Sequence, residues 1–395
     1  MSLERCVGDK DKFLASQWGK EPLLRSGVSA NGFADLITLA EVDSLLAGAA
    51  LRYPAVRLVK AGTPLPLATF TKKATIGSRP LHDLIDPGRV HSHFADGATI
   101  VLQGLHRYWP RLADFCRGLE LELSHPVQVN LYLTPPGSQG LNVHYDTHDV
   151  FVLQVSGKKE WRVYGAAVEA PLPHQKKRSP EDPGEPLEQA VLRPGDALYI
   201  PRGFLHAAAT NDAESAHLTV GVLAHTWRDV LTEIMKDADD LPYLRRALPP
   251  GYVDDRAQWG DEMADVVERI AAWLTTVDPE EIRARMARRF YSGRAPLLEG
   301  QLRQILALDD IDDSTEVTRR RGAVFVVSSE EWRAVVRLGD RRLEMPPWLS
   351  DVLDHIAGLD RFVVGDLSAW LDEPSRKVLV RRLVREGALE QVLRD

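Results

Sequence analysis

The feature that most constrains this fold is a close pair of metal-ligand residues and a distant third one. His144 and Asp146 stand two positions apart, and His206 follows 62 positions after His144. Two histidines and one carboxylate are the set that holds non-haem Fe(II) on one face of its octahedron. The opposite face stays open to a cosubstrate and O2. The fold must therefore bring distant residues into one site, and the open face indicates oxidation chemistry.

Turn and strand patterns surround both ligand positions. After His144, an apolar run at 150–155, a glycine turn and a second run at 159–164 predict two strands. Before His206, the turn signals Pro-Gly-Asp and Pro-Arg-Gly flank a short strand at 197–200. Two hairpins that deliver ligands to one place predict a double-stranded β-helix, the cupin or jelly-roll barrel.

The chain is too long for one typical core, and its patterns predict an α+β protein with three parts. Residues 1–230 are expected to form the barrel with flanking helices. Residues 231–300 carry apolar side chains at helical spacing, and 301–395 read as strand, helix, helical turn, helix and strand, similar to a winged helix. The polar, proline-rich stretch 171–186 is expected to form an exposed loop near the barrel mouth.

Local signals place several individual elements. Thr38 and Glu41 fit a capping box that begins a helix at 39–51. Apolar residues on one side predict a helix at 102–121. Asp278 and Pro279 fit the N-cap and first turn of a later helix, and the run 323–327 predicts a strand.

The predicted pocket contains further binding candidates. A cosubstrate inside an apolar barrel needs a cation for its distal carboxylate, and in this iron class the cosubstrate is usually 2-oxoglutarate. Lys159 lies two positions from the apolar Trp161, so both side chains point to the same face of the strand. We therefore expect Lys159 to be buried and paired with an anion. Lys158 points to the opposite face. Residues on the polar face of strand 127–133 and on the last barrel strand complete the cosubstrate-binding set: Asn130, His217 and Thr219. His148, and the pair His91 and His93, remain weaker alternatives as metal ligands.

Composition limits the protein's setting and its partners. A net charge of −8 disfavours nonspecific binding to nucleic acid or anionic membranes. Cys6 and Cys116 are too few for a disulfide framework, which favours a reduced, cytoplasmic setting. We find no apolar run long enough to span a membrane and no signal-peptide pattern at the first residues.

On these residues the chain resembles the JmjC-domain Fe(II)/2-oxoglutarate oxygenases, in particular the ribosomal-protein hydroxylases. The resemblance rests on residues 18–25, Asp96–Thr99 and, most specifically, residues 144–164 with Gly157, Lys159 and Trp161. It implies that His144, Asp146 and His206 carry iron, and that Lys159 and Asn130 bind 2-oxoglutarate. It also implies a homodimer through the helical segment and hydroxylation of an arginine or histidine side chain in a ribosomal protein. Some members have Asn or Ser near the position of His217.

Other functions remain open at this stage. A tailoring hydroxylase of a ribosomally made peptide or natural product would use the same iron site. A histone demethylase would need an aromatic cage that the sequence does not place. A cupin-like sensor with a DNA-binding winged helix would need no iron ligands, and residues 301–395 hold 15 Lys and Arg against 18 Asp and Glu, so DNA binding is not expected.

Overall fold

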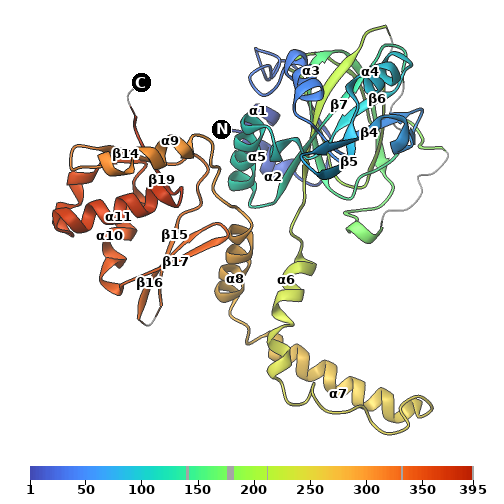
Figure 1. The fold of residues 1–395 in the computed structure, drawn as a ribbon. Helices are drawn as coiled ribbons and strands as arrows, with labels where there is room; N and C mark the ends of the chain where they lie inside the picture. Colours follow the sequence, from blue (N-terminus) through green and yellow to red (C-terminus); the bar gives the residue numbers. More distant parts are fainter. Residues whose placement is uncertain (139–141, 176–181, 211, 331, 394–395) are drawn as a thin grey trace. The chain divides into compact units, whose positions relative to one another are not determined.

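The computed structural model describes residues 1–138, 142–175, 182–210, 212–330 and 332–393. The chain forms two compact units, residues 1–224 and residues 225–395 (Figure 1). None of the helices in the described ranges is long and apolar enough to cross a membrane.

The first unit contains most of the strands. They are β1 (Leu23–Arg25), β2 (Val56–Lys60), β3 (Thr63–Pro64), β4 (Thr71–Ile76), β5 (Arg79–Ile85), β6 (Thr99–Leu102), β7 (Val127–Thr134), β8 (Asp149–Gly157), β9 (Lys159–Ala166), β10 (Glu188–Leu192), β11 (Ala197–Ile200), β12 (Phe204–Ala209) and β13 (Ser215–Val222). Its helices are α1 (Glu4–Val7), α2 (Lys10–Ser16), α3 (Leu39–Gly48), α4 (Pro87–Ala95) and α5 (Pro110–Leu123), with 3₁₀ turns η1 (Leu67–Thr69), η2 (Leu105–Arg107) and η3 (Pro173–Gln175).

Two antiparallel sheets form the predicted double-stranded β-helix. The larger has the order β1-β11-β8-β13-β7-β6-β2-β3 and the smaller has the order β10-β9-β12. Val152 from β8 and Leu198 from β11 pack with Trp161 from β9 in one buried cluster, so the two sheets face each other. The other face of the larger sheet is closed by α2, α3 and α5, because alternate residues of each strand point to opposite faces.

Strand β7 shows how this alternation creates the site. Its odd-numbered residues Val129 and Leu131 are fully buried in the core beneath the helices. Its even-numbered residues Asn130 and Tyr132 line cavities inside the barrel. The predicted division of this strand into an apolar face and a polar face is therefore confirmed, and the polar face lines the cavities.

Some predicted boundaries are confirmed and others shift. The Thr38–Glu41 capping box is present: the Thr38 N–H donates to Glu41 Oε2 at 2.8 Å, and the Glu41 N–H donates to Thr38 Oγ1 at 3.3 Å. The helix expected at 102–121 begins only at Pro110. Leu102 ends β6, and Gly104 in the left-handed region separates that strand from the helix.

The second unit is helical at first and mixed afterwards. Its helices are α6 (Trp227–Ile234), α7 (Arg256–Leu274), α8 (Pro279–Ser292), α9 (Gln301–Leu306), α10 (Ser350–Gly358) and α11 (Glu373–Arg385), with 3₁₀ turns η4 (Asp237–Asp240), η5 (Leu308–Asp310), η6 (Pro347–Leu349) and η7 (Val364–Ala369). Its strands are β14 (Glu316–Arg319), β15 (Val326–Glu330), β16 (Arg333–Leu338), β17 (Arg341–Met345), β18 (Arg361–Val363) and β19 (Leu389–Gln391).

The order of elements in the second unit follows most of the sequence prediction. Asp278 caps α8 through the Glu280 N–H, with Pro279 in the first turn. The strand expected at 323–327 instead begins at Val326, after a turn at Gly322. Two small sheets, β18-β14-β19 and β15-β16-β17, enclose one apolar core with α10 and α11.

Candidate metal centre

The two predicted histidine ligands are neighbours in the β structure. His144 lies just before β8, His206 lies in β12, and the two form an isolated antiparallel bridge. Asp146 follows in the same turn, and its carbonyl accepts a hydrogen bond from the Gly203 N–H at 2.9 Å. The turn between β11 and β12 therefore contacts Asp146 through Gly203 and leads directly into the strand that carries His206.

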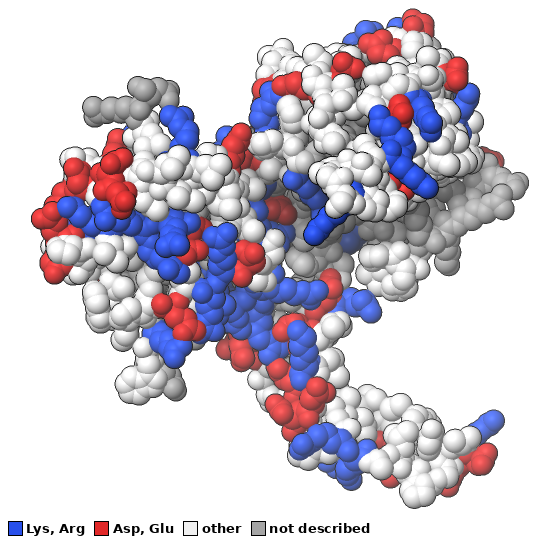
Figure 2. Space-filling model, in the orientation of Figure 1, with Lys and Arg blue, Asp and Glu red and all other residues white. Residues whose placement is uncertain are grey.

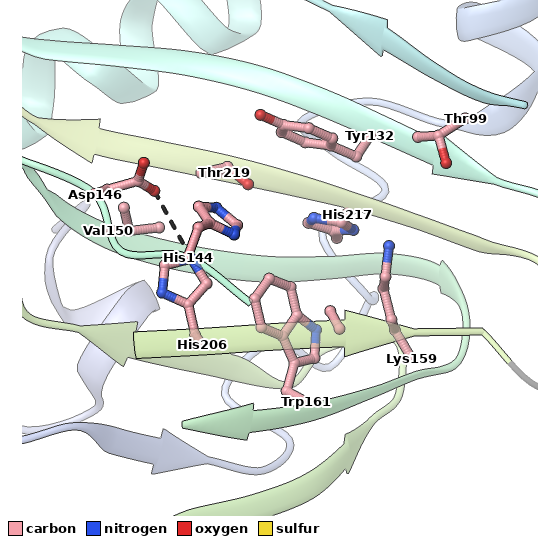
Figure 3. A pocket seen from close by; sticks show the side chains of 11 residues that line it. Thr99, Tyr132, His144, Asp146, Val150, Lys159, Trp161, His206, His217 and Thr219 are labelled. Atoms are coloured by element: carbon pink, nitrogen blue, oxygen red, sulfur yellow. Dashed lines mark ion pairs between the residues drawn. The ribbon is translucent and has the colours of Figure 1, made fainter. Parts of the chain in front are cut away.

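The three predicted ligands come together in one group (Figure 3). One ligand atom each of His144, Asp146 and His206 lie within 4.8 Å of one another. His206 Nε2 is 3.8 Å from Asp146 Oδ2, and the two imidazole rings are 4.4 Å apart between centroids. No other such cluster of His, Cys, Asp or Glu occurs in the described part of the chain. Nitrogen and carboxylate donors in this arrangement fit a divalent iron ion.

Both imidazoles are held with one nitrogen free. His144 Nδ1 lies 2.7 Å from the Asn142 carbonyl oxygen, and His206 Nδ1 lies 3.1 Å from the Phe204 carbonyl oxygen. Because a carbonyl can only accept, each Nδ1 carries the proton and each Nε2 is left with its lone pair. A hydrogen bond to a backbone carbonyl is a common way to orient a metal-binding histidine.

Burial keeps the His206 imidazole unprotonated, the form that can bind a metal ion. Burial, and then the neighbouring His144, lower the pKa of His206 to about 4. His206 is therefore neutral at physiological pH, as metal coordination requires.

Lys159 lies inside the barrel, where the sequence predicted a buried cation. Only 4% of its surface is exposed, and Nζ donates to Thr134 Oγ1 at 3.1 Å. Thr134 in turn accepts from Thr99 Oγ1 at 3.1 Å. Burial lowers the pKa of Lys159 to about 8. Within the described ranges no carboxylate forms an ion pair with it, so the pocket offers a cation that lacks an anion.

His217 forms the wall beside Lys159. Its ring stacks on Tyr132 with centroids 5.2 Å apart, and it meets Trp161 edge-on at 5.4 Å. Burial and then the charge of Lys159 hold the pKa of His217 well below its usual range. Its buried Nδ1 has no hydrogen-bond partner in the described structure. A neutral imidazole with an unused nitrogen therefore faces the pocket.

The predicted site residues are distributed over two adjoining cavities. The inner pocket is lined by Thr99, Tyr132, His144, Asp146, Val150, Lys159, Trp161, His206, Ala208, His217 and Thr219 (Figure 3). The outer cavity, of about 380 Å³, is lined by Arg57, Val59, Gly62, Val101, Asn130, Tyr132, Asn142, Val143, His144, Asp146, His148 and Thr219. His144, Asp146 and Thr219 line both cavities, whereas His206, Lys159 and His217 line only the inner one.

Asn130 lies apart from Lys159. It lines the outer cavity, and its Oδ1 accepts a hydrogen bond from the Gly104 N–H at 2.9 Å. The amide nitrogen of Asn130 is the group left for a ligand. Its assignment as a 2-oxoglutarate contact stays a prediction.

Several residues that line the cavities or contact Lys159 were not singled out from the sequence. Thr134 and Tyr132 share the even parity of Asn130 on β7, so extending the same alternation along the strand finds them. Thr99 on β6 lacked such a signal, because no strand was predicted there and Leu102, the last residue of β6, was placed at the start of a helix. Arg57 on β2 also lay outside any predicted strand.

The alternative histidine ligands lie elsewhere. His148 lines the outer cavity and packs against Gly221, where an added Cβ would lie 2.5 Å from its ring. His91 Nε2 is 3.6 Å from Asp43 Oδ1 in an exposed pair, and His93 Nε2 lies 3.3 Å from the Thr69 carbonyl oxygen. None of the three belongs to the metal group.

The loop at 171–186 is described only in part, because residues 176–181 lie outside the described ranges. The Tyr145 hydroxyl donates to the Gln175 carbonyl oxygen at 3.0 Å. Tyr145 stands between two of the predicted ligands, so this part of the loop is tied to the ligand turn.

Comparison with known proteins places this geometry in a context. Residues 101–230 match the JmjC domain family. The chain is 31% identical over 244 residues to the bifunctional lysine-specific demethylase and histidyl-hydroxylase NO66 of Drosophila persimilis, covering 60% of this chain and 34% of that protein. It is 32% identical over 254 residues to human ribosomal oxygenase 1, covering 62% of this chain and 38% of that protein. The matched segment thus spans less than half of either relative.

Solved structures share the fold over nearly the whole chain. The X-ray structure of Escherichia coli ycfD has a TM-score of 0.60 and 18% identity, and covers 98% of this chain and 99% of its own. The ribosomal oxygenase YcfD in complex with cobalt and 2-oxoglutarate has a TM-score of 0.55 and 19% identity, covering 98% of both chains. At this identity the likeness shows the fold, including the order of the two units.

Proposed function

We propose that the protein is an Fe(II)- and 2-oxoglutarate-dependent oxygenase that hydroxylates a ribosomal protein, because its residues 101–230 match the JmjC domain family. The target would be an arginine or histidine side chain. Relatives named as ribosomal oxygenases and a histidyl-hydroxylase support this class of substrate. The two free, buried cysteines support a reducing, cytoplasmic setting.

The observation that carries this proposal is the buried Lys159 cation beside the metal group. A charged lysine inside an apolar barrel is unfavourable unless an anion accompanies it. Among the described residues, the only hydrogen-bond partner of its ammonium group is the neutral Thr134 hydroxyl. A dicarboxylate such as 2-oxoglutarate supplies one carboxylate to Lys159 and leaves its other end for the metal.

The remaining residues have distinct roles in this proposal. His144, Asp146 and His206 would hold iron, which with 2-oxoglutarate and O2 supplies the oxidising chemistry and leaves succinate and CO2. Thr134 orients the Lys159 ammonium group, and His217, through Nδ1, offers a further contact to the cosubstrate. Thr219 lies where the inner pocket meets the outer cavity, so it would contact the cosubstrate at that junction. The buried Trp161 excludes water from the inner pocket.

Dimerisation through residues 231–300 is part of the same proposal. None of the nineteen residues of α7 is buried, although Met263, Val267 and neighbouring side chains are apolar. An apolar groove runs between α7 and the preceding segment, lined by Tyr243, Leu244, Leu248, Pro249, Trp259, Met263 and Val266 among others. A helix with exposed apolar surface is expected to be covered by a partner, and a second copy fits the resemblance.

For the winged-helix-like region 301–395 we propose a structural role rather than DNA binding. Four of the five basic residues of α11 already have partners. Arg376 pairs with Asp313, Lys377 pairs with Glu373, Arg382 pairs with Glu386, and Arg381 donates to backbone carbonyls. Figure 2 shows acidic side chains interspersed with the basic ones on this unit. Such pairing weakens the field that a phosphate backbone would require.

A comparison of ribosomal proteins tests the proposed function. Intact masses are measured from the native host with and without the gene. We expect one ribosomal protein to become lighter by the mass of one oxygen atom when the gene is deleted. The purified protein should also form succinate from 2-oxoglutarate when supplied with Fe(II). Unchanged ribosomal masses together with succinate formation would redirect the search to small peptides, whereas absence of turnover would contradict the oxygenase.

A further inference from the structure

The outer cavity contains a charged residue to which the proposed function assigns no role. Arg57 on β2 lies opposite Val101 on β6, and Val101 lies opposite Tyr132 on β7. Residues directly opposite in antiparallel strands share a face of the sheet. Arg57 therefore points to the same side as Tyr132, the side that contains the metal group, and it lines the outer cavity.

The guanidinium of Arg57 is not neutralised. Within the described residues it forms no ion pair and no hydrogen bond, in contrast to most arginines of the second unit. Its positive charge reaches the site, because it opposes the rise of the Tyr132 pKa that burial and Asp146 cause. The outer cavity therefore carries a positive charge at its wall.

The negative charge in the same cavity belongs to the metal group. Asp146 is the only carboxylate among the described residues that line it. Asp146 belongs to the metal group, so an iron ion would take up its charge. A cationic side chain that entered the cavity would meet Arg57 without an acidic group to compensate.

Amide groups supply the rest of the polar lining. Asn130 keeps its amide nitrogen after its Oδ1 has accepted the Gly104 N–H. The amide of Asn142 lies against Gly62, where an added Cβ would be 2.6 Å from Nδ2. Amides can donate to a ring nitrogen and accept from a ring N–H, so they suit a neutral imidazole.

We propose that Arg57 determines specificity by excluding cationic side chains, so that the outer cavity takes the neutral imidazole of a histidine in the substrate protein rather than a guanidinium. This inference rests on the proposed function and names the target residue within it. The same repulsion applies to a methylated lysine, which is also cationic. Such a group additionally needs several aromatic faces, and Tyr132 is the only Phe, Tyr or Trp among the described lining residues of the outer cavity.

The test uses the ribosomal-protein segment in which the mass comparison finds the added oxygen. Fragmentation should map the oxygen to a histidine. The segment is then synthesised in two forms, with histidine or arginine at that position, and hydroxylation of each is measured by mass. Wild-type protein should prefer the histidine form by at least roughly tenfold, as expected for two like charges held close in a partly buried site.

Two variants at position 57 and one control complete the design. Arg57→Glu should raise hydroxylation of the arginine form at least roughly tenfold over wild type, because repulsion becomes attraction. Arg57→Gln, the milder change, should reduce the preference for histidine. Lys60→Glu changes a charge on the same strand at an exposed position outside the cavity, and it should leave the preference unchanged.

Each outcome separates this inference from the proposed function. Oxygen on arginine, lysine or any residue other than histidine overturns the inference and leaves the oxygenase standing. An unchanged preference in both Arg57 variants that still form succinate also overturns it. Absence of 2-oxoglutarate turnover in the wild-type protein contradicts the proposed function, and the inference falls with it.

Discussion

His144 and His206 are joined backbone to backbone. The His144 N–H donates to the His206 carbonyl oxygen at 3.1 Å, and the His206 N–H donates to the His144 carbonyl oxygen at 2.8 Å. Each side chain is also fixed through Nδ1 to the carbonyl two residues earlier. The β structure therefore positions both imidazoles, and a metal ion would meet ligands that are already arranged.

Removing the third ligand should abolish metal binding without unfolding the protein. In Asp146→Ala we expect Co(II) or Fe(II) affinity to fall by more than the roughly 100-fold that loss of an outer partner costs, because a direct charged ligand is lost. Calorimetric titration measures the affinity, and circular dichroism checks the fold. His91→Ala is the matched control, since His91 forms only an exposed pair with Asp43. Wild-type succinate formation by Asp146→Ala would contradict the assigned centre.

Two adjacent lysines provide a matched test of the cosubstrate pocket. Lys159→Met should raise the KM for 2-oxoglutarate roughly 10- to 100-fold, the value of one hydrogen bond to a charged group. Lys158→Met should change it little, because Lys158 is partly exposed, lies outside both cavities and pairs with Asp212. Steady-state succinate formation at varied 2-oxoglutarate measures both. Equal effects of the two substitutions would refute the proposed role of Lys159.

The sequence was sufficient for the parts of this site that follow from alternation. Because side chains on a strand point alternately to two faces, Lys159 could be separated from Lys158 and the polar face of β7 could be recognised. The grouping of His144, Asp146 and His206 was predictable because their residue types and the turns that flank each of them are specific. Each of these inferences used residues close together in the chain.

The parts that were missed depend on contacts between distant strands. Arg57 reaches the site only because β2 joins the sheet beside β6, and no local pattern shows that pairing. The strand at Thr99–Leu102 was missed because the predicted helix, whose later part is α5, was begun at the strand's last residue, Leu102. Gly104 was the available stop signal between them, through its left-handed conformation.

Cosubstrate binding should weaken in alkaline solution. The pKa of Lys159 is lowered to about 8, so its charge is lost as pH rises through that value. We expect the KM for 2-oxoglutarate to increase between pH about 7 and about 10, the interval that spans this pKa and the ordinary lysine value. Lys159→Arg should flatten the profile, because arginine stays charged. The same alkaline increase in Lys159→Arg would assign the effect to another group.

The stability of the cosubstrate-free protein should change in the opposite direction. The pKa of Lys159 in the folded state lies below that in the unfolded chain, so between about 8 and about 10 the unfolded state binds more protons. The contribution of this residue to the free energy of unfolding therefore rises with pH across that interval. Chemical denaturation at several pH values measures the free energy of unfolding of wild type and of Lys159→Met. The value for wild type should rise relative to the value for Lys159→Met across this pH interval.

A charge placed on α7 should separate the proposed dimer. Met263 is 43% exposed and lines the apolar groove, so in a dimer its side chain would be covered. Met263→Glu would then bury an unpaired carboxylate, and we expect at least roughly tenfold weaker self-association, since such burial costs more than about 1.4 kcal/mol. Sedimentation velocity over a range of concentrations measures the effect. Glu268→Gln, also on α7 but outside the groove, serves as the control and should associate like wild type. A wild-type protein that stays monomeric at all concentrations, or a Met263→Glu variant that associates normally, would remove α7 from the interface and leave its exposed apolar side chains without an explanation.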